Sequence, residues 1–183
     1  MKNNNTFKEY VAPILVLVCI CLVVTGALAA TYGVAKPIID ENSIKAANEA
    51  RALVLPEGDD YETVAAGDLI EGVDECCIAG NGAGMTVTAH AKGFGGAVKI
   101  MVGIDANGAI TGVTVTEHAE TPGLGTKDMT VEYLSQYNGI TEAPGAHIND
   151  DANIDAVTGA TITANAIYGG VHLALEQYAE VSK

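Results

Sequence analysis

A long stretch without charge constrains this chain more than any other feature. Residues 10–35 contain no Asp, Glu, Lys or Arg, and most of them are Val, Ile, Leu, Ala or Cys. Such a stretch is long enough to cross the hydrocarbon core of a bilayer as one α-helix. Pro13 fits the first turn of this helix and Pro37 its end, because proline has no N–H group to donate. We predict a transmembrane helix over residues 10–36, after a short tail over residues 1–9.

A cleaved signal peptide is the alternative interpretation of the same stretch. Lys2 and Lys8 precede the apolar residues, and Ala-Leu-Ala at residues 27–29 resembles a cleavage site. The apolar character continues through Val34, which favours a retained anchor over a short leader. Basic residues lie on both sides of the stretch, so the charge distribution leaves the orientation across the membrane open.

The charge of the chain excludes one class of partner. The 183 residues include 23 acidic and only 9 basic side chains, and the net charge is −14. Arg51 is the only arginine, so no basic patch is available to neutralise a nucleic-acid backbone. Neither the four cysteines nor the four histidines show metal-ligand spacing. We therefore expect no nucleic acid, no metal site and ordinary unpaired thiols.

Helical periodicity appears on both sides of a strand-rich centre. Apolar residues recur at helical spacing up to Pro56, which predicts an amphipathic linker helix over residues 37–56. A second such pattern follows a Thr-rich start and ends at Val181, which predicts a closing C-terminal helix. Residues 128–136 fit a shorter helix between the sheet and this last one.

Strand patterns fill the centre of the chain. Apolar and polar residues alternate in three segments, and Asp-Ala-Asn-Gly joins the last two as a hairpin. The apolar phase slips beside Gly112, which predicts a bulge there. An acidic, Gly-rich stretch before these segments predicts loops with one short strand. The four predicted strands are residues 61–64, 85–90, 98–104 and 110–117. These patterns predict an α+β domain over residues 57–183, with a largely antiparallel sheet and a C-terminal helix.

A cluster of small and hydroxyl-bearing residues precedes the C-terminal helix. Residues 155–161 read Asp-Ala-Val-Thr-Gly-Ala-Thr. They stand where the free N–H groups and the positive end of the helix dipole point outward, a place that suits an anion. The alternative is that Thr158, Thr161 or Thr163 only caps the helix.

The same segment resembles the Asp-x-x-Ser/Thr-Gly-Ala-Thr flavinylation motif of the FMN-binding domain family. Three further blocks resemble, in order, the G subunit of the Rnf electron-transport complex. They are Gly-Phe-Gly-Gly at residues 93–96, Gly-Ile-Asp at residues 103–105, and Glu-His-Ala-Glu-Thr-Pro-Gly-Leu-Gly-Thr-Lys at residues 117–127. With the membrane anchor, the resemblance extends over nearly the whole chain except residues 57–81.

The resemblance implies an FMN attached through its phosphate to Thr161 as a phosphoester. Gly159 and Ala160 would let the backbone approach the phosphate, and Thr158 would donate a hydrogen bond to it. The loop after the last strand is expected against the flavin ring, with a histidine beside it as a protonatable neighbour. The candidate cofactor-binding residues are Asp155, Thr158, Gly159, Ala160, Thr161, His118, Glu120, Thr121, Gly123, Leu124 and Gly125.

A member of this family is expected to be the electron-carrying flavoprotein subunit of a membrane-bound, ion-translocating ferredoxin:NAD⁺ oxidoreductase. The resemblance implies an extracytoplasmic flavin domain, a flavin transferase that attaches FMN, and other Rnf subunits that exchange electrons with it. The coupling ion, Na⁺ or H⁺, stays open. One alternative is the C subunit of the Na⁺-translocating NADH:quinone reductase, which is typically longer. Others are a stand-alone membrane-anchored flavoprotein for extracellular electron transfer, and a binding module in which Thr161 only caps a helix.

Overall fold

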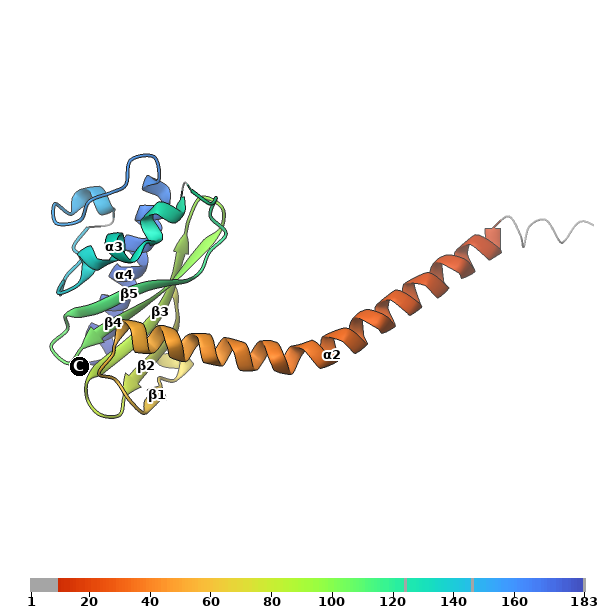
Figure 1. Ribbon diagram of the computed structural model, residues 1–183, viewed down its shortest axis with the longest axis horizontal. Helices are drawn as coiled ribbons and strands as arrows, with labels where there is room; N and C mark the ends of the chain where they lie inside the picture. The colour runs from red at the N-terminus through yellow and green to blue at the C-terminus, as the bar shows by residue number, and fades with distance from the viewer. Residues whose placement is uncertain (1–9, 124, 146, 183) are drawn as a thin grey trace, which may run out of the picture. The chain divides into compact units, whose positions relative to one another are not determined.

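The computed structural model describes residues 10–123, 125–145 and 147–182 (Figure 1). The chain divides into two compact units, with the boundary between Ala46 and Ala47. The first unit holds most of a long helix, α2. The second unit holds the last residues of α2 and the whole of an α+β domain.

Helix α2 runs from Ala12–Val54 as one element of 43 residues. Pro37 lies inside it, so the predicted helix end at this residue was wrong. Proline removes one backbone hydrogen bond, but helix-forming neighbours on both sides keep the backbone helical. Lys36 Nζ and Asp40 Oδ2 lie 3.4 Å apart as an i,i+4 ion pair across this position. The division into a membrane segment over residues 10–36 and a linker over residues 37–56 stays a prediction.

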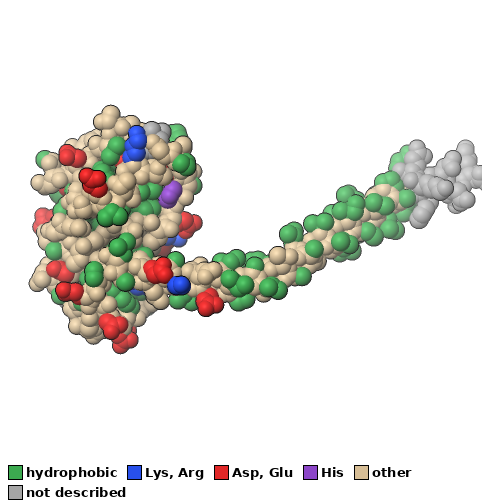
Figure 2. All heavy atoms as spheres, in the orientation of Figure 1, with side chains coloured by type: hydrophobic (Ala, Val, Ile, Leu, Met, Phe, Trp, Pro, Cys, Tyr) green, Lys and Arg blue, Asp and Glu red, His purple; other side chains and the backbone are tan. Residues whose placement is uncertain are grey.

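One helix in the described part of the chain is long and apolar enough to cross a membrane by length and composition. It is α2, whose most apolar window has a mean hydropathy of 2.8. Apolar side chains cover this helix, and charged ones appear only toward its C-terminal part (Figure 2). A signal sequence near the N-terminus meets the same criterion, so the two interpretations of this segment remain open.

The domain is built on a five-stranded antiparallel sheet in which each strand pairs with the next along the chain. The strands are β1 Tyr61–Thr63, β2 Val73–Ala79, β3 Gly84–Lys92, β4 Ala97–Asp105 and β5 Ile110–Glu117. The predicted largely antiparallel sheet and the β4–β5 hairpin are confirmed. The register skips Thr111, because Gly103 pairs with Gly112 and Ile104 with Ile110, so the extra residue lies next to the predicted Gly112.

Strand β2 was not predicted, because its sequence does not alternate. Cys76 and Cys77 are consecutive and both are buried free thiols. Successive side chains in a strand point to opposite faces, so both faces of the sheet are covered at this strand. Alternation is the usual sequence signal of a strand, and this stretch, which lacks it, was therefore interpreted as a loop.

Helix α4, Thr161–Val181, covers one face of the sheet and lies behind β3 and β4 in Figure 1. Gly170 lets it approach closely, because a Cβ there would lie 2.6 Å from Ile100 Cδ1. On the other face, the end of α2 rests on the paired Gly103 and Gly112, and the Thr111 hydroxyl donates to the Val54 carbonyl. Because both faces are covered, the core lies on each side of β4.

Short helical turns connect β5 to α4. They are η3 Gly125–Met129, α3 Val131–Leu134, η4 Ser135–Tyr137 and η5 Ile148–Asp150; a further turn, η2 Ala66–Asp68, precedes β2. The single helix predicted over residues 128–136 is thus divided into separate turns. The Thr130 side chain accepts from the Tyr133 N–H group and forms a new N-cap at the start of α3. The β3–β4 turn, the segment after β5 and the start of α4 lie at one end of the domain (Figure 1).

Candidate functional site

A pocket of about 290 Å³ opens at the end of the domain where these three segments meet. Its size is close to the lower end of the range for small-molecule sites. The segments that form it are the turn after β3, the loop after β5 and the first turn of α4. The lining residues are Phe94, Glu120, Thr121, Gly125, Gly159, Ala160, Thr161, Ile162 and Thr163.

Thr161 is the first residue of α4 and is exposed. The N-cap position belongs to Ala160, which makes no side-chain cap hydrogen bond. Among the residues that the structure describes, none accepts from or donates to the Thr161 hydroxyl. The N–H groups of the first turn have no partner within a helix and carry its positive dipole end. Thr161 therefore presents a hydroxyl at the pocket beside an anion-binding helix N-terminus.

Gly159 gives the chain the turn that leads into this helix. Its φ is +91°, a left-handed conformation that glycine adopts without the steric penalty of a Cβ. A Cβ there would meet nothing within 4 Å. Backbone conformation, and not a lack of space, is therefore what requires glycine at this position.

Glu120 holds the three segments of the pocket together. Its side chain is buried, and its two oxygens have different partners. Oε1 accepts from the Gly95 N–H group at 3.0 Å, in the turn after β3. Oε2 accepts from the Thr163 hydroxyl at 2.8 Å, in the first turn of α4. The Glu120 N–H group donates to His118 Nδ1 at 3.3 Å, so the loop after β5 is fixed at the same point.

Glycine is required where backbone approaches this carboxylate. A Cβ on Gly125 would lie 2.6 Å from Glu120 Oε2 and 2.8 Å from Thr163 Oγ1. A Cβ on Gly93 would collide with Glu120 Oε1. Gly93, in the motif block at residues 93–96, and Gly125, in the block at residues 117–127, thus make room for the Glu120 carboxylate.

Asp128, in η3, is a second buried carboxyl group near Glu120. Its side chain is 0% exposed, and neither oxygen has a hydrogen-bond partner among the described residues. Burial, followed by the negative charge of Glu120, raises the pKa of Asp128 to about 6, against a lowering by Lys127. A buried carboxyl group without donors favours its neutral form, because desolvation penalises the charge.

Two exposed apolar side chains stand at the rim of the pocket. Phe94 is 70% exposed and Ile162 is 52% exposed. Phe94 lies in the Gly-rich turn after β3, and Ile162 follows Thr161 on α4. Large exposed apolar side chains gathered at a pocket are typical of a ligand site.

The structure brings six of the predicted site residues to the pocket: Thr161, Gly159, Ala160, Glu120, Thr121 and Gly125. Thr158, Gly123 and His118 are exposed and do not line it. Asp155 also lies outside the lining, where its N–H group donates to Gln136 Oε1 at 2.8 Å. Leu124 lies outside the described residues. Sequence reasoning missed Phe94, Ile162 and Thr163 as lining residues, although Phe94 is conspicuous as the single aromatic residue among glycines.

Comparison with known proteins assigns the pocket-bearing region to a family model. Residues 93–176 match the FMN-binding domain. The G subunit of the Na⁺-translocating ferredoxin:NAD⁺ oxidoreductase complex of Acetobacterium woodii is 33% identical, with 92% of this chain and 91% of that protein covered. The chain belongs to the G-subunit family of ion-translocating oxidoreductase complexes.

Two other members of this family are similar to this chain in sequence over most of their length. The G subunit of the ion-translocating oxidoreductase complex of Methanosarcina acetivorans is 29% identical, over 92% of this chain and 94% of that protein. The G subunit of the proton-translocating ferredoxin:NAD⁺ oxidoreductase complex of Clostridium ljungdahlii is 27% identical, over 86% and 85%. Among solved structures, Shewanella oneidensis NqrC has a TM-score of 0.43 at 23% identity, with coverage of 69% and 66%. The predicted family and fold class are confirmed.

Proposed function

We propose that this G-subunit family member carries electrons on an FMN that is joined by a phosphoester to Thr161 Oγ. The observation that supports the proposal is the position of Thr161. Its hydroxyl is exposed at the pocket, at the first position of α4, and the N-cap role belongs to Ala160. A hydroxyl that serves as a helix cap would stand one residue earlier and would accept from the first turn.

The residues around the pocket suit the two halves of FMN. The first-turn N–H groups of α4 stabilise a phosphate anion, and Gly159 and Ala160 leave no large side chain in its way. Phe94 and Ile162 offer apolar surface to a planar ring at the rim. FMN, when bound, supplies reversible electron transfer. The chain supplies position, and Glu120 fixes the walls of the pocket through Gly95 and Thr163.

The protein acts within a larger membrane complex. The relatives are named as subunits of ferredoxin:NAD⁺ oxidoreductases that translocate Na⁺ or protons, so we propose the same assembly for this chain. The remaining subunits would deliver and remove electrons, and a flavin transferase would attach FMN to a domain on the extracytoplasmic side. Helix α2 would retain this domain at the membrane. A covalently held cofactor is not lost by dilution when free FMN is scarce.

The second candidate function is a stand-alone, membrane-anchored flavoprotein, which differs from the proposed subunit in having no partner subunits in the membrane. Purification of the tagged chain from its native membrane in mild detergent separates the two classes. The proposal predicts co-purification of other membrane subunits and a chain whose intact mass exceeds the sequence mass by FMN less one water. Flavin on a chain that purifies alone would favour the stand-alone protein. An intact mass without flavin would contradict both.

A further inference from the structure

We propose that Asp128 is the proton-accepting residue of this site, and that it binds one proton when one electron enters the pocket. The proposal rests on the proposed function, since it requires a redox cofactor in the pocket. Its structural basis is a pair of buried carboxyl groups: Glu120, which lines the pocket, and Asp128, whose pKa the charge of Glu120 raises. No part of the flavinylation motif includes Asp128, which lies in η3, the turn whose first residue, Gly125, lines the pocket.

The geometry of η3 directs Asp128 toward Glu120. Side chains three residues apart in a 3₁₀-helix lie above one another on the same edge. Gly125 and Asp128 are such a pair in η3. Gly125 lines the pocket, and its Cβ position points at Glu120 Oε2, 2.6 Å away. The edge that carries Asp128 is therefore the edge that faces Glu120.

The two carboxyl groups differ in their hydrogen bonds. Glu120 accepts from Gly95 and from Thr163, so each of its oxygens has one donor. Both oxygens of Asp128 are buried without a donor among the described residues. A charge added nearby therefore meets one carboxyl group whose two oxygens already have donors and another whose oxygens have none among the described residues.

Other titratable groups face Asp128 from each neighbouring element. Glu120 faces it from the loop after β5, and Lys127 is its neighbour on η3. Tyr133 of α3 and Tyr137 of η4 are close enough for the charge of Asp128 to raise the pKa of each hydroxyl. The two rings form an edge-to-face pair with centroids 6.4 Å apart, and both hydroxyls are buried. Lys127 is thus the only cation among these facing groups.

The proton and electron steps balance. A reduced one-electron carrier delivers one electron to the pocket and is itself oxidised. The added negative charge raises the pKa of Asp128 for the same like-charge reason as Glu120 does. The Asp128 carboxylate then binds one proton from solvent and becomes a carboxylic acid. When an oxidised carrier removes the electron, Asp128 releases the proton, so the net charge of the site is the same before and after the cycle.

The pKa of Asp128 sets the pH range in which reduction is accompanied by proton uptake. Burial, with the charge of Glu120, raises the pKa of Asp128 to about 6 before any electron arrives. Below about pH 5 Asp128 is already protonated, and it takes up nothing on reduction. Above about pH 6 it is ionised, and the first electron brings one proton to Asp128 until the pH exceeds the pKa of Asp128 in the reduced state.

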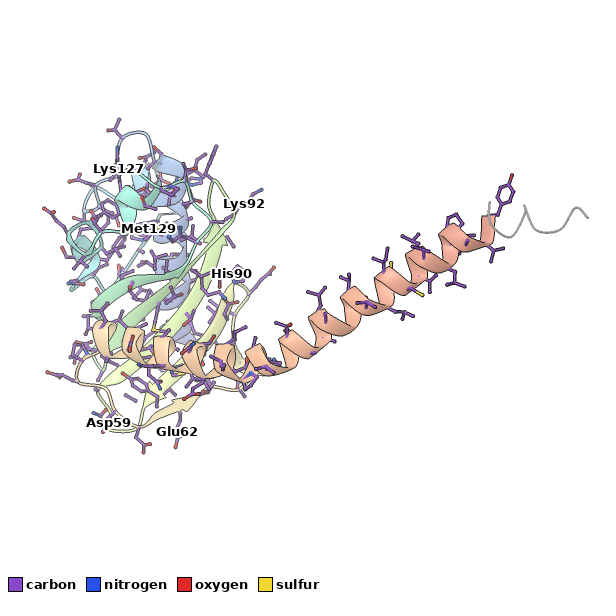
Figure 3. All side chains as sticks on the ribbon, turned by 45° about the vertical axis from the view of Figure 1, so that its right-hand side comes forward. Asp59, Glu62, His90, Lys92, Lys127 and Met129 are labelled. Atoms are coloured by element: carbon purple, nitrogen blue, oxygen red, sulfur yellow. The ribbon has the colours of Figure 1, made fainter. Side chains whose placement is uncertain are left out.

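The test counts protons on the full-length, flavin-loaded chain in detergent. Wild type, Asp128→Asn and the control Asp59→Asn are photoreduced in weakly buffered solution with a pH indicator, from about pH 5 to about pH 8. Asp59 is a suitable control because it lies at the opposite end of the domain from Lys127, the neighbour of Asp128 (Figure 3). We expect wild type and Asp59→Asn to take up about one more proton per flavin reduced than Asp128→Asn near pH 7, with no difference below about pH 5. Equal uptake by all three proteins at pH 7 would overturn the proposal.

A second variant and a cofactor-free measurement separate the possible failures. Glu120→Gln removes the like charge, so the window of extra proton uptake should move to lower pH. Infrared spectra of flavin-free protein at pH 5 should show a buried carboxylic acid band that Asp128→Asn lacks. If intact mass shows no flavin, the proposed function fails and takes this inference with it. If flavin is attached but proton uptake matches in wild type and Asp128→Asn, or the infrared band is absent, only the inference fails.

Discussion

Replacing Glu120 with alanine removes the acceptor that joins three segments of the pocket. The Gly95 N–H group and the Thr163 hydroxyl would lose their partner. Each buried donor left unpaired costs about 1–3 kcal/mol, so the two together cost about 2–6 kcal/mol. Relief of the repulsion with Asp128 opposes this cost, and we expect a net loss of about 2–4 kcal/mol in the free energy of unfolding. That is a large part of the roughly 5–15 kcal/mol typical of a domain.

Glu120→Gln is the matched control, because it keeps the shape of the side chain. Its carbonyl oxygen can accept from Gly95, and its amide can donate to the Thr163 oxygen, since a hydroxyl both donates and accepts. We expect a loss of about 1 kcal/mol or less, from the weaker neutral hydrogen bonds. Urea denaturation of the full chain in detergent measures both variants, with the near-ultraviolet circular dichroism of the buried Tyr137 and Tyr168 as signal. Equal losses in the two variants would refute the assigned role of the Glu120 oxygens.

Three further predictions use the same unfolding measurement or a simple extension of it. Gly125→Ala places a methyl group against Glu120 Oε2 and should lower the free energy of unfolding by about 1–3 kcal/mol; no loss would contradict the close approach. Arg51→Ala removes the 2.8 Å ion pair with Glu75 and should cost about 1.5–3 kcal/mol, with faster amide exchange over the last turn of α2. The pKa of Asp128 is raised on folding, so its contribution to stability is complete below about pH 4 and is lost as the pH rises through about 6. Asp128→Asn should therefore be more stable than wild type at pH 7 by up to about 3 kcal/mol, with no gain at pH 4; a gain at both values would refute the assigned pKa.

Elements with a regular sequence period were predictable from the sequence. Strands β3, β4 and β5 alternate, and α4 keeps apolar residues at helical spacing, so periodicity identified all four. Strand β2 escaped because its buried cysteines are adjacent. Pro37 led to the prediction of a helix end that the structure does not have. The local rule for helix ends does not include the stability of the helix on either side of the proline.

The site was predictable only in part, for a physical reason. The resemblance of residues 155–161 and of the loop after β5 to family motifs predicted Thr161, Glu120 and Gly125, and all three line the pocket. The contact of Glu120 with Thr163 joins residues far apart in the chain, and no sequence spacing encodes it. Burial of Asp128 likewise depends on how η3 packs in the folded domain.

The most direct test of the account compares Thr161→Ala with Thr158→Ala. Both threonines belong to the motif, but only Thr161 lines the pocket. Wild type and both variants are co-expressed with a flavin transferase and denatured, and in-gel flavin fluorescence is compared with the mass of the peptide that contains residues 155–163. The account predicts fluorescence and a peptide heavier by FMN less one water in wild type and Thr158→Ala, and neither signal in Thr161→Ala. Fluorescence that survives in Thr161→Ala, or a modified residue at Thr158 or Thr163, would contradict it.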